Sequence, residues 1–172
     1  GAFNTTMNLN GEYPGYTMSD SYDPQIYQKL LNEKLYTQSE KNTFTFLHLR
    51  GCHLPYAMDA DCNKVELNSV PVLEQTKGSF RIINEYISQM KALGIYENST
   101  IIITGDHSSL ISDTEEYTDE NLTALLVKEK GEFGTDMKES TAQVSQANLH
   151  ATIIKSAEIQ TSVNYGDAYS EI

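Results

Sequence analysis

Two kinds of hydrophobic spacing divide the chain into expected helices and strands. Stripes at three- and four-residue spacing, typical of one helix face, predict helices at 24–37, 72–93 and 143–156. Asp23 and Pro24 form a start signal for the first helix, as N-cap and first helical residue. The stripe of the longest helix, which we expect to face the core, consists of Phe80, Ile83, Ile87 and Met90.

Three short segments rich in β-branched and aromatic residues predict strands. They lie at 43–49, 100–105 and 123–127. The first two strands are joined by helix 72–93, and such β-α-β units are parallel and right-handed in nearly all cases. We therefore expect an α/β fold with one mainly parallel sheet flanked by helices.

Charge and hydropathy restrict the partners of the chain. Its 172 residues include 12 basic and 24 acidic side chains, a formal net charge of −12. Nucleic-acid binding depends on a basic surface, so we expect no nucleic-acid partner. No apolar run approaches the roughly 18 residues of a membrane span. We therefore expect contact with a membrane only through segments outside this sequence.

Two cysteines, Cys52 and Cys62, are too few for a disulfide scaffold. Their separation does not fit a Cys-x-x-Cys zinc pair. They could close one local disulfide if the protein is exported, or they could remain two free thiols. The sequence leaves both alternatives open.

An acidic loop at 57–69 partly matches an EF-hand. Asp59, Asp61 and Asn63 stand at the first, third and fifth positions of such a calcium loop. Lys64, however, stands where the EF-hand needs glycine, and no bidentate glutamate ends the loop. We therefore reject an EF-hand here.

The clearest candidate for chemistry follows the strand at 100–105. Gly105 ends this strand, and Asp106 and His107 come directly after it. Ligands of open α/β sheets bind beyond the carboxyl ends of the strands, and carboxylate and imidazole both bind divalent metals. Alternatively, Asp106 caps a turn and His107 is a solvated loop residue. The dipeptide alone leaves both alternatives open.

Several motifs occur in a fixed order along the chain. An apolar strand leads to His53-Leu54-Pro55-Tyr56, a helix leads to Gly94-Ile95-Tyr96-Glu97-Asn98-Ser99-Thr100, and the next strand ends in Gly105-Asp106-His107. Over residues 20–157 this order resembles the C-terminal half of the sulfatase branch of the alkaline phosphatase superfamily. The similarity is greatest to the lipoteichoic acid synthase (phosphoglycerol transferase) group. Residues 1–19 and 158–172 would then be a polar arm and a polar tail.

The resemblance implies an alkaline-phosphatase-like α/β/α fold, present here as a partial domain, and assigns roles to three side chains. Asp106 and His107 would bind a divalent metal, which is manganese or else zinc, magnesium or calcium. His53 would contact the phosphate or sulfate of the substrate. No family role extends to Arg50 or His48, and we expect His48 to be a core histidine.

The chain departs from the family pattern in two motifs. Ser108 stands where the family usually has glycine after Asp-His, and Asn148-Leu149-His150-Ala151-Thr152 replaces Asp-Leu-x-Pro-Thr. Neither change removes a metal ligand, so they indicate a divergent member.

The larger departure is a missing nucleophile. In the family, the nucleophile and another metal carboxylate lie N-terminal to these motifs, and no matching segment precedes residue 43. Cys52 and Ser108 are not at the nucleophile position. The resemblance therefore implies the later part of a catalytic domain, whose missing N-terminal half is a required partner. By itself this chain would bind metal weakly and be inactive.

Two functions from different classes follow. The first is metal-dependent transfer or hydrolysis of phosphate esters of the phosphoglycerol type, or of sulfate esters. It would take place in the cell envelope, outside the cytoplasm, with the full-length protein anchored in the membrane. The second is a non-catalytic module that keeps the fold and binds a cation or a partner. An acidic ligand and a nucleophile upstream of residue 1 would favour the enzyme.

Overall fold

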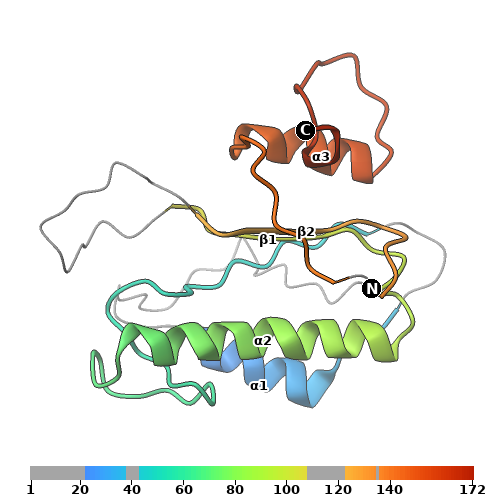
Figure 1. The fold of residues 1–172 in the computed structure, drawn as a ribbon. Coiled ribbons are helices and arrows are strands. Elements are labelled where there is room, and N and C mark those ends of the chain that lie inside the picture. Colours follow the sequence, from blue (N-terminus) through green and yellow to red (C-terminus); the bar gives the residue numbers. More distant parts are fainter. Residues whose placement is uncertain (1–21, 38–42, 108–122, 135) are drawn as a thin grey trace, which may run out of the picture. The chain divides into compact units, whose positions relative to one another are not determined.

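The computed structural model describes residues 22–37, 43–107, 123–134 and 136–172. Figure 1 shows their elements, which are α1 (Asp23–Glu33), α2 (Val72–Ala92), β1 (Ile101–Thr104), β2 (Leu125–Lys128), α3 (Ala147–Ser156) and the 3-10 helix η1 (Tyr169–Glu171). The chain divides into two compact units, Gly1–Tyr96 and Glu97–Ile172. The expected arm at 1–19 lies outside the described residues.

Helix α1 packs against α2 and ends earlier than predicted. Leu30 of α1 is fully buried. The prediction of a helix over 24–37 is wrong at its end, because Lys34 has φ 60°, a left-handed conformation that does not continue a helix. Gln89 of α2 covers this end: its Oε1 accepts a hydrogen bond from the Leu35 amide (2.7 Å), and its Nε2 donates to the Leu30 carbonyl (2.9 Å).

Asp23 does not cap α1, contrary to the prediction. Asp23 is 2% exposed and is the first residue of the helix, whose N-cap is Tyr22, and no side-chain hydrogen bond caps this end. The two carboxylate oxygens accept hydrogen bonds from the backbone amides of Arg50 (2.9 Å) and Gly51 (3.1 Å). Desolvation raises the pKa of Asp23 above its ordinary value, although both hydrogen bonds oppose this shift. Asp23 therefore ties the start of α1 to the loop that carries His53.

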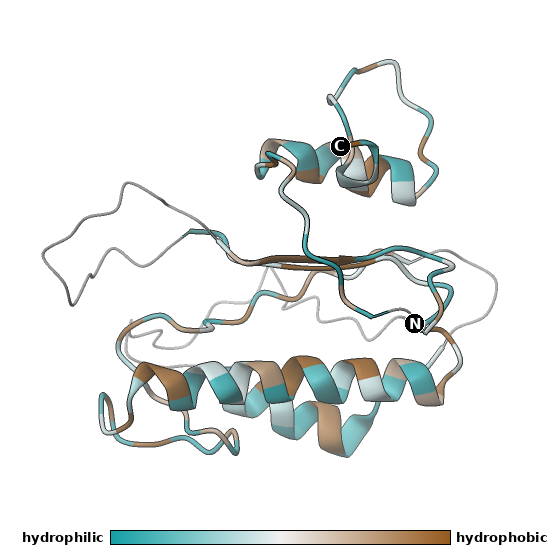
Figure 2. Ribbon diagram, in the orientation of Figure 1, coloured by the Kyte–Doolittle hydropathy of each residue, from teal (hydrophilic) through white to brown (hydrophobic). Residues whose placement is uncertain are grey.

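Helix α2 lies where it was predicted, but its buried face differs from the predicted stripe. Phe80 is 49% exposed, whereas its neighbour Ile82 is fully buried. The buried residues of α2 are Gln75, Gly78, Ser79, Ile82, Gln89 and Met90. Figure 2 shows polar and apolar residues alternating along this helix. The prediction is wrong at Phe80 because two glutamines and a glycine occupy the face that meets α1 and the preceding loop.

The prediction of a strand at 43–49 is wrong for this structure. Among the described residues the segment has no strand partner. Its side chains nevertheless alternate as in a strand: Leu47 and Leu49 pack on the core, and Phe44 and Phe46 are 67% and 69% exposed. The core that they meet consists of Ile26, Met58, Cys62 and Ile82. Residues 43–49 thus show the alternation of buried and exposed side chains that led to the prediction, but in the described part of the chain they form no backbone hydrogen-bond ladder with another strand. His48 is exposed, so the expectation of a core histidine is also wrong.

In the second unit, β1 and β2 confirm two of the predicted strands. They pair antiparallel, with Ile101 opposite Lys128 and Thr104 opposite Leu125. Lys128 Nζ also donates to the Ser99 carbonyl (3.0 Å), which holds the chain just before β1. These two strands form the only sheet in the described part of the chain. The mainly parallel sheet of the whole fold stays a prediction.

The end of the chain returns to α3. The sequence predicts a polar tail at 158–172, and the structure shows how its last residues are held. The Tyr169 amide donates to Thr152 Oγ1 (2.8 Å), and Lys155 Nζ lies 2.8 Å from Glu171 Oε1. Both contacts join η1 to α3, so the last residues are part of the second unit.

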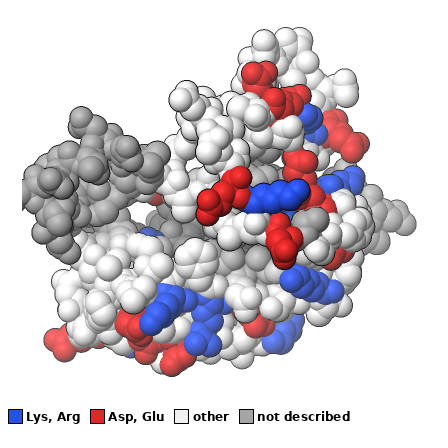
Figure 3. Space-filling view, in the orientation of Figure 1, with Lys and Arg blue, Asp and Glu red and all other residues white. Residues whose placement is uncertain are grey.

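Charged side chains of the first unit form local pairs, and Figure 3 shows acidic and basic groups interspersed on its surface. The pairs are Lys29–Glu33 (3.8 Å), Lys34–Glu85 (3.8 Å), Glu74–Lys77 (2.9 Å) and Asp61–Arg81 (2.7 Å). At least one side chain of each pair is about half exposed or more, so each pair contributes at most about 1 kcal/mol. None of the helices in the described ranges combines the length and apolar character that a bilayer crossing requires.

Candidate metal and substrate site

The predicted metal pair directly follows β1. The Gly105 amide donates to the Ala124 carbonyl (3.1 Å), so the ladder continues to the residue before the pair. A Cβ on Gly105 would lie 3.3 Å from Thr123 Cβ, so the chain segments before Asp106 and before β2 approach each other closely here. The side chains of Asp106 and His107 are 69% and 57% exposed. Both candidate ligands therefore lie at the surface just beyond the strand.

The geometry of the pair fits part of a divalent metal site. The His107 amide donates to Asp106 Oδ1 (3.0 Å), and His107 Nε2 lies 3.8 Å from the same oxygen. Metal–nitrogen and metal–oxygen bonds are each about 2.0–2.2 Å, so an ion bound to both atoms would hold them about 3.0–3.4 Å apart. The two atoms lie farther apart than this, so the side chains would have to move closer by roughly half an ångström to share an ion. Within the described ranges, no group of three or more His, Cys, Asp or Glu side chains is placed to hold a metal. The pair supplies two ligands, and further ligands would have to come from elsewhere.

Gln146 holds the backbone of the turn that carries Asp106. Its Nε2 donates to the carbonyls of Gly105 (2.9 Å) and Asp106 (2.7 Å). Gln146 directly precedes α3, which begins at Ala147 rather than at residue 143 as predicted. The hydrophobic pattern placed Gln146 inside that helix, and no local signal pointed to a contact some forty residues away.

A second layer of hydrogen bonds supports the segment before α3. Tyr169 Oη donates to the Ser145 carbonyl (3.1 Å), and the Ser145 amide donates to Asn148 Oδ1 (2.9 Å). Asn148 Nδ2 in turn donates to the Asp167 carbonyl (3.0 Å). The end of the chain therefore fixes the residue next to Gln146.

His53, the predicted substrate ligand, lies in the loop that leads to α2. Its side chain is exposed, and its ring Nδ1 contacts the carbonyl oxygen of Leu54. His53 belongs to the first unit, whereas Asp106 and His107 belong to the second. The convergence of the three side chains at one sheet edge stays a prediction.

A buried glutamine of α2 holds the loop around His53. Gln75 is 1% exposed, and its amide makes four hydrogen bonds to the backbone. Its Nε2 donates to the carbonyls of Gly51 (2.7 Å) and His53 (3.0 Å). Its Oε1 accepts from the amides of Ala57 (2.7 Å) and Met58 (3.3 Å). The sequence pattern gave no sign of this role, because glutamine in a helix is usually exposed.

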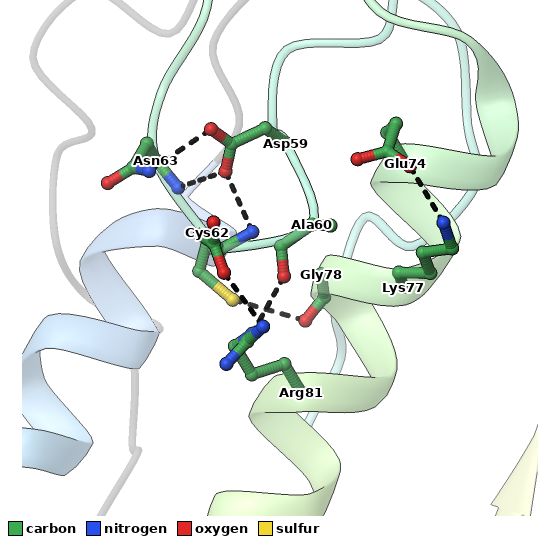
Figure 4. Close-up of polar contacts among 9 residues, drawn as sticks. Asp59, Ala60, Cys62, Asn63, Glu74, Lys77, Gly78 and Arg81 are labelled. Atoms are coloured by element: carbon green, nitrogen blue, oxygen red, sulfur yellow. Dashed lines mark hydrogen bonds and ion pairs between the residues drawn. The ribbon is translucent and has the colours of Figure 1, made fainter.

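In the acidic loop, Asp59 binds the loop's own backbone and Asp61 binds Arg81 of α2 (Figure 4). Asp59 Oδ1 accepts hydrogen bonds from the amides of Asp61 and Asn63, both at 2.9 Å. Arg81 donates to Asp61 Oδ1 and to the Ala60 carbonyl, both at 2.7 Å. Desolvation opposes the ionised form of Asp59, but the hydrogen bonds from Asn63 and the Asp61 amide lower its pKa below the ordinary value. The loop is thus a turn closed by an ion pair to α2.

The two cysteines are free thiols, so the disulfide alternative is not realised here. Cys52 is exposed, and its Sγ lies 3.1 Å from Thr76 Oγ1. Cys62 is buried, and its Sγ donates to the Gly78 carbonyl (3.2 Å). Burial raises the pKa of Cys62 to about 11, so this thiol stays protonated and acts as a core residue.

No protein-family model, curated protein or solved structure matches the chain. The resemblance to the sulfatase branch therefore stays a prediction. It rests on the ordered motifs of the sequence, and the roles of Asp106, His107 and His53 depend on it.

Proposed function

We propose that this chain is the later part of a metal-dependent, sulfatase-like phosphotransferase or hydrolase domain. Its substrates would be phosphate esters of the phosphoglycerol type or sulfate esters. The observation that carries the proposal is the exposed pair Asp106 and His107, which directly follows β1. A carboxylate and an imidazole at a strand end match both the position and the chemistry of a divalent metal site.

Each candidate residue has a distinct task in this proposal. Asp106 and His107 hold a divalent cation, for which manganese is the first candidate and zinc, magnesium and calcium the others. When bound, such a cation stabilises negative charge on a transferred phosphoryl or sulfuryl group. His53 would donate a hydrogen bond to the oxygens of that group, for which an exposed imidazole on a backbone held by Gln75 is suited.

Another stretch of protein supplies the nucleophile in this proposal. No segment of the sequence resembles the family's nucleophile strand, so this chain alone would bind metal weakly and turn over no ester. Location in the cell envelope and a membrane anchor outside this sequence belong to the same proposal, and they rest on the resemblance alone.

A Mn²⁺ titration of the 172-residue chain tests the metal pair. Free Mn²⁺ is followed by electron paramagnetic resonance in the wild type and in Asp106→Ala/His107→Ala. The matched control is Asp136→Ala/His150→Ala, which removes the same residue types at exposed positions of the second unit. We expect the first double variant to bind at least about tenfold more weakly, a difference of roughly 1.4 kcal/mol, and the control to bind like the wild type. Equal affinity in all three proteins would contradict the proposed site.

Ester turnover tests the reaction. The native-length protein should hydrolyse a chromogenic phosphodiester or sulfate ester in excess Mn²⁺, and Asp106→Ala/His107→Ala should abolish this activity. The 172-residue chain should hydrolyse neither ester. If the 172-residue chain hydrolysed an ester and the double variant did not, the proposal that this chain lacks the nucleophile would be contradicted. Metal binding without any turnover by the native-length protein would favour the non-catalytic module.

A further inference from the structure

We propose that Gln146 is a positioning residue for the pair Asp106 and His107. The inference deepens the proposed function and rests on it for the metal. The observed contact of Gln146 with this turn is made by its Nε2, which donates to the backbone carbonyls of Gly105 and Asp106. It acts through the conformation of the turn.

The contact selects one conformation of the chain. Successive residues of a pleated strand point in alternating directions, so one amide group reaches two consecutive carbonyls only where the chain turns. Both hydrogens of the Gln146 NH₂ group are used, at 2.9 Å to Gly105 and 2.7 Å to Asp106. These two hydrogen bonds, called the Gln146 clamp below, therefore fix the peptide planes on both sides of the Asp106 Cα. They also fix the direction in which the Asp106 carboxylate leaves the backbone.

The clamp is itself held in place. Ser145, its neighbour, accepts a hydrogen bond from Tyr169 and donates one to Asn148. Gln146 therefore links the turn after β1 to α3 and to the end of the chain. Because Gln146 lies at the surface, we expect its hydrogen bonds to orient the turn that carries Asp106 more than they stabilise the fold. Residues that orient metal ligands typically change metal affinity about 10- to 100-fold when they are replaced.

Gln146→Met is the decisive variant, because methionine keeps the length of the side chain and lacks the donor. Gln143→Met makes the same exchange at an exposed position three residues earlier and serves as the control. We expect Gln146→Met to lower backbone ¹⁵N order parameters at Asp106 and His107. We also expect Mn²⁺ affinity to fall about tenfold or more. The melting temperature should stay at that of the control.

The two readouts separate the possible failures. Unchanged order parameters in Gln146→Met would overturn the positioning role, whatever happens to metal binding. Reduced order with Mn²⁺ affinity equal to that of Gln143→Met would overturn the link to the metal pair, while the proposed function stands. If wild-type affinity already equals that of Asp106→Ala/His107→Ala, the proposed metal site fails, and this inference fails with it.

Discussion

Replacing Gly78 with alanine should destabilise the first unit, although alanine is the better helix former. On an exposed helix face the exchange would gain about 1 kcal/mol. Gly78, however, faces the acidic loop: a Cβ there would lie 2.4 Å from the Asp59 carbonyl oxygen and 2.9 Å from Met58 Cε. Real Cβ contacts essentially never fall below 3.0 Å. Because one of these atoms is backbone, the loop itself must move.

The expected magnitude follows from what that movement disturbs. Overpacking of a tight site costs about 1–3 kcal/mol. A displaced loop also weakens the hydrogen bond from Cys62 Sγ to the Gly78 carbonyl (3.2 Å) and the bonds from Ala57 and Met58 to Gln75. Each such bond contributes roughly 0.5–1.5 kcal/mol. After subtraction of the gain in helix propensity, we expect a net loss of about 1–3 kcal/mol in the free energy of unfolding.

Urea unfolding followed by far-ultraviolet circular dichroism measures this loss, because α1 and α2 supply most of the helical signal. Ser88→Ala is the control: Ser88 lies on the exposed side of the same helix, where alanine should stabilise slightly. The steric argument would be refuted if Gly78→Ala unfolded at the same urea concentration as Ser88→Ala, or at a higher one, with an unchanged slope.

At about pH 8 a disulfide reagent should label Cys52 well before Cys62, whose pKa of about 11 leaves roughly one thiolate in a thousand; equal rates would contradict the burial of Cys62. Carbon-13 NMR titration should place the pKa of Asp23 above 3.8 and that of Asp59 below it. The lowered pKa of Asp59 raises the free energy of unfolding above the unfolded pKa, and this contribution is lost as the pH falls through the lowered folded pKa. The raised pKa of Asp23 has the opposite effect, because its ionisation lowers the free energy of unfolding as the pH rises from 3.8 through the raised folded pKa. Gln75→Leu leaves four backbone groups without their partner and should lower the free energy of unfolding by about 2–4 kcal/mol in the same urea assay, and a loss below about 1 kcal/mol would contradict its role in the loop.

Elements with a strong local signal were predictable from the sequence. Helix α2 was predicted at 72–93 and runs over Val72–Ala92, because long periodic stripes and a following glycine determine such a helix locally. The β-branched run before Gly105 likewise predicted β1, and the position of Asp106 and His107 just beyond it followed from that strand. These features need information from only a few neighbouring residues.

Features that depend on distant residues were not predictable. The end of α1 depends on Gln89, which contacts Leu35 from 54 positions away. The core face of α2 depends on buried glutamines, which a hydrophobic pattern counts as polar and assigns to the surface. A strand at 43–49 needs a partner as well as alternation. Gln146 illustrates the same limit at the candidate site, since its partners lie 40 and 41 positions earlier.

The amide of Gln75 has a genetic consequence. Its head group combines an oxygen that accepts two hydrogen bonds with a nitrogen that donates two, and only asparagine shares this combination. Single-base changes of a glutamine codon give glutamate, lysine, arginine, histidine, leucine or proline, and asparagine requires more than one change and is one methylene shorter. We therefore expect that no amino-acid exchange reached by a single base change at position 75 keeps the loop around His53, whereas the exposed Lys77 on the same helix should accept most exchanges.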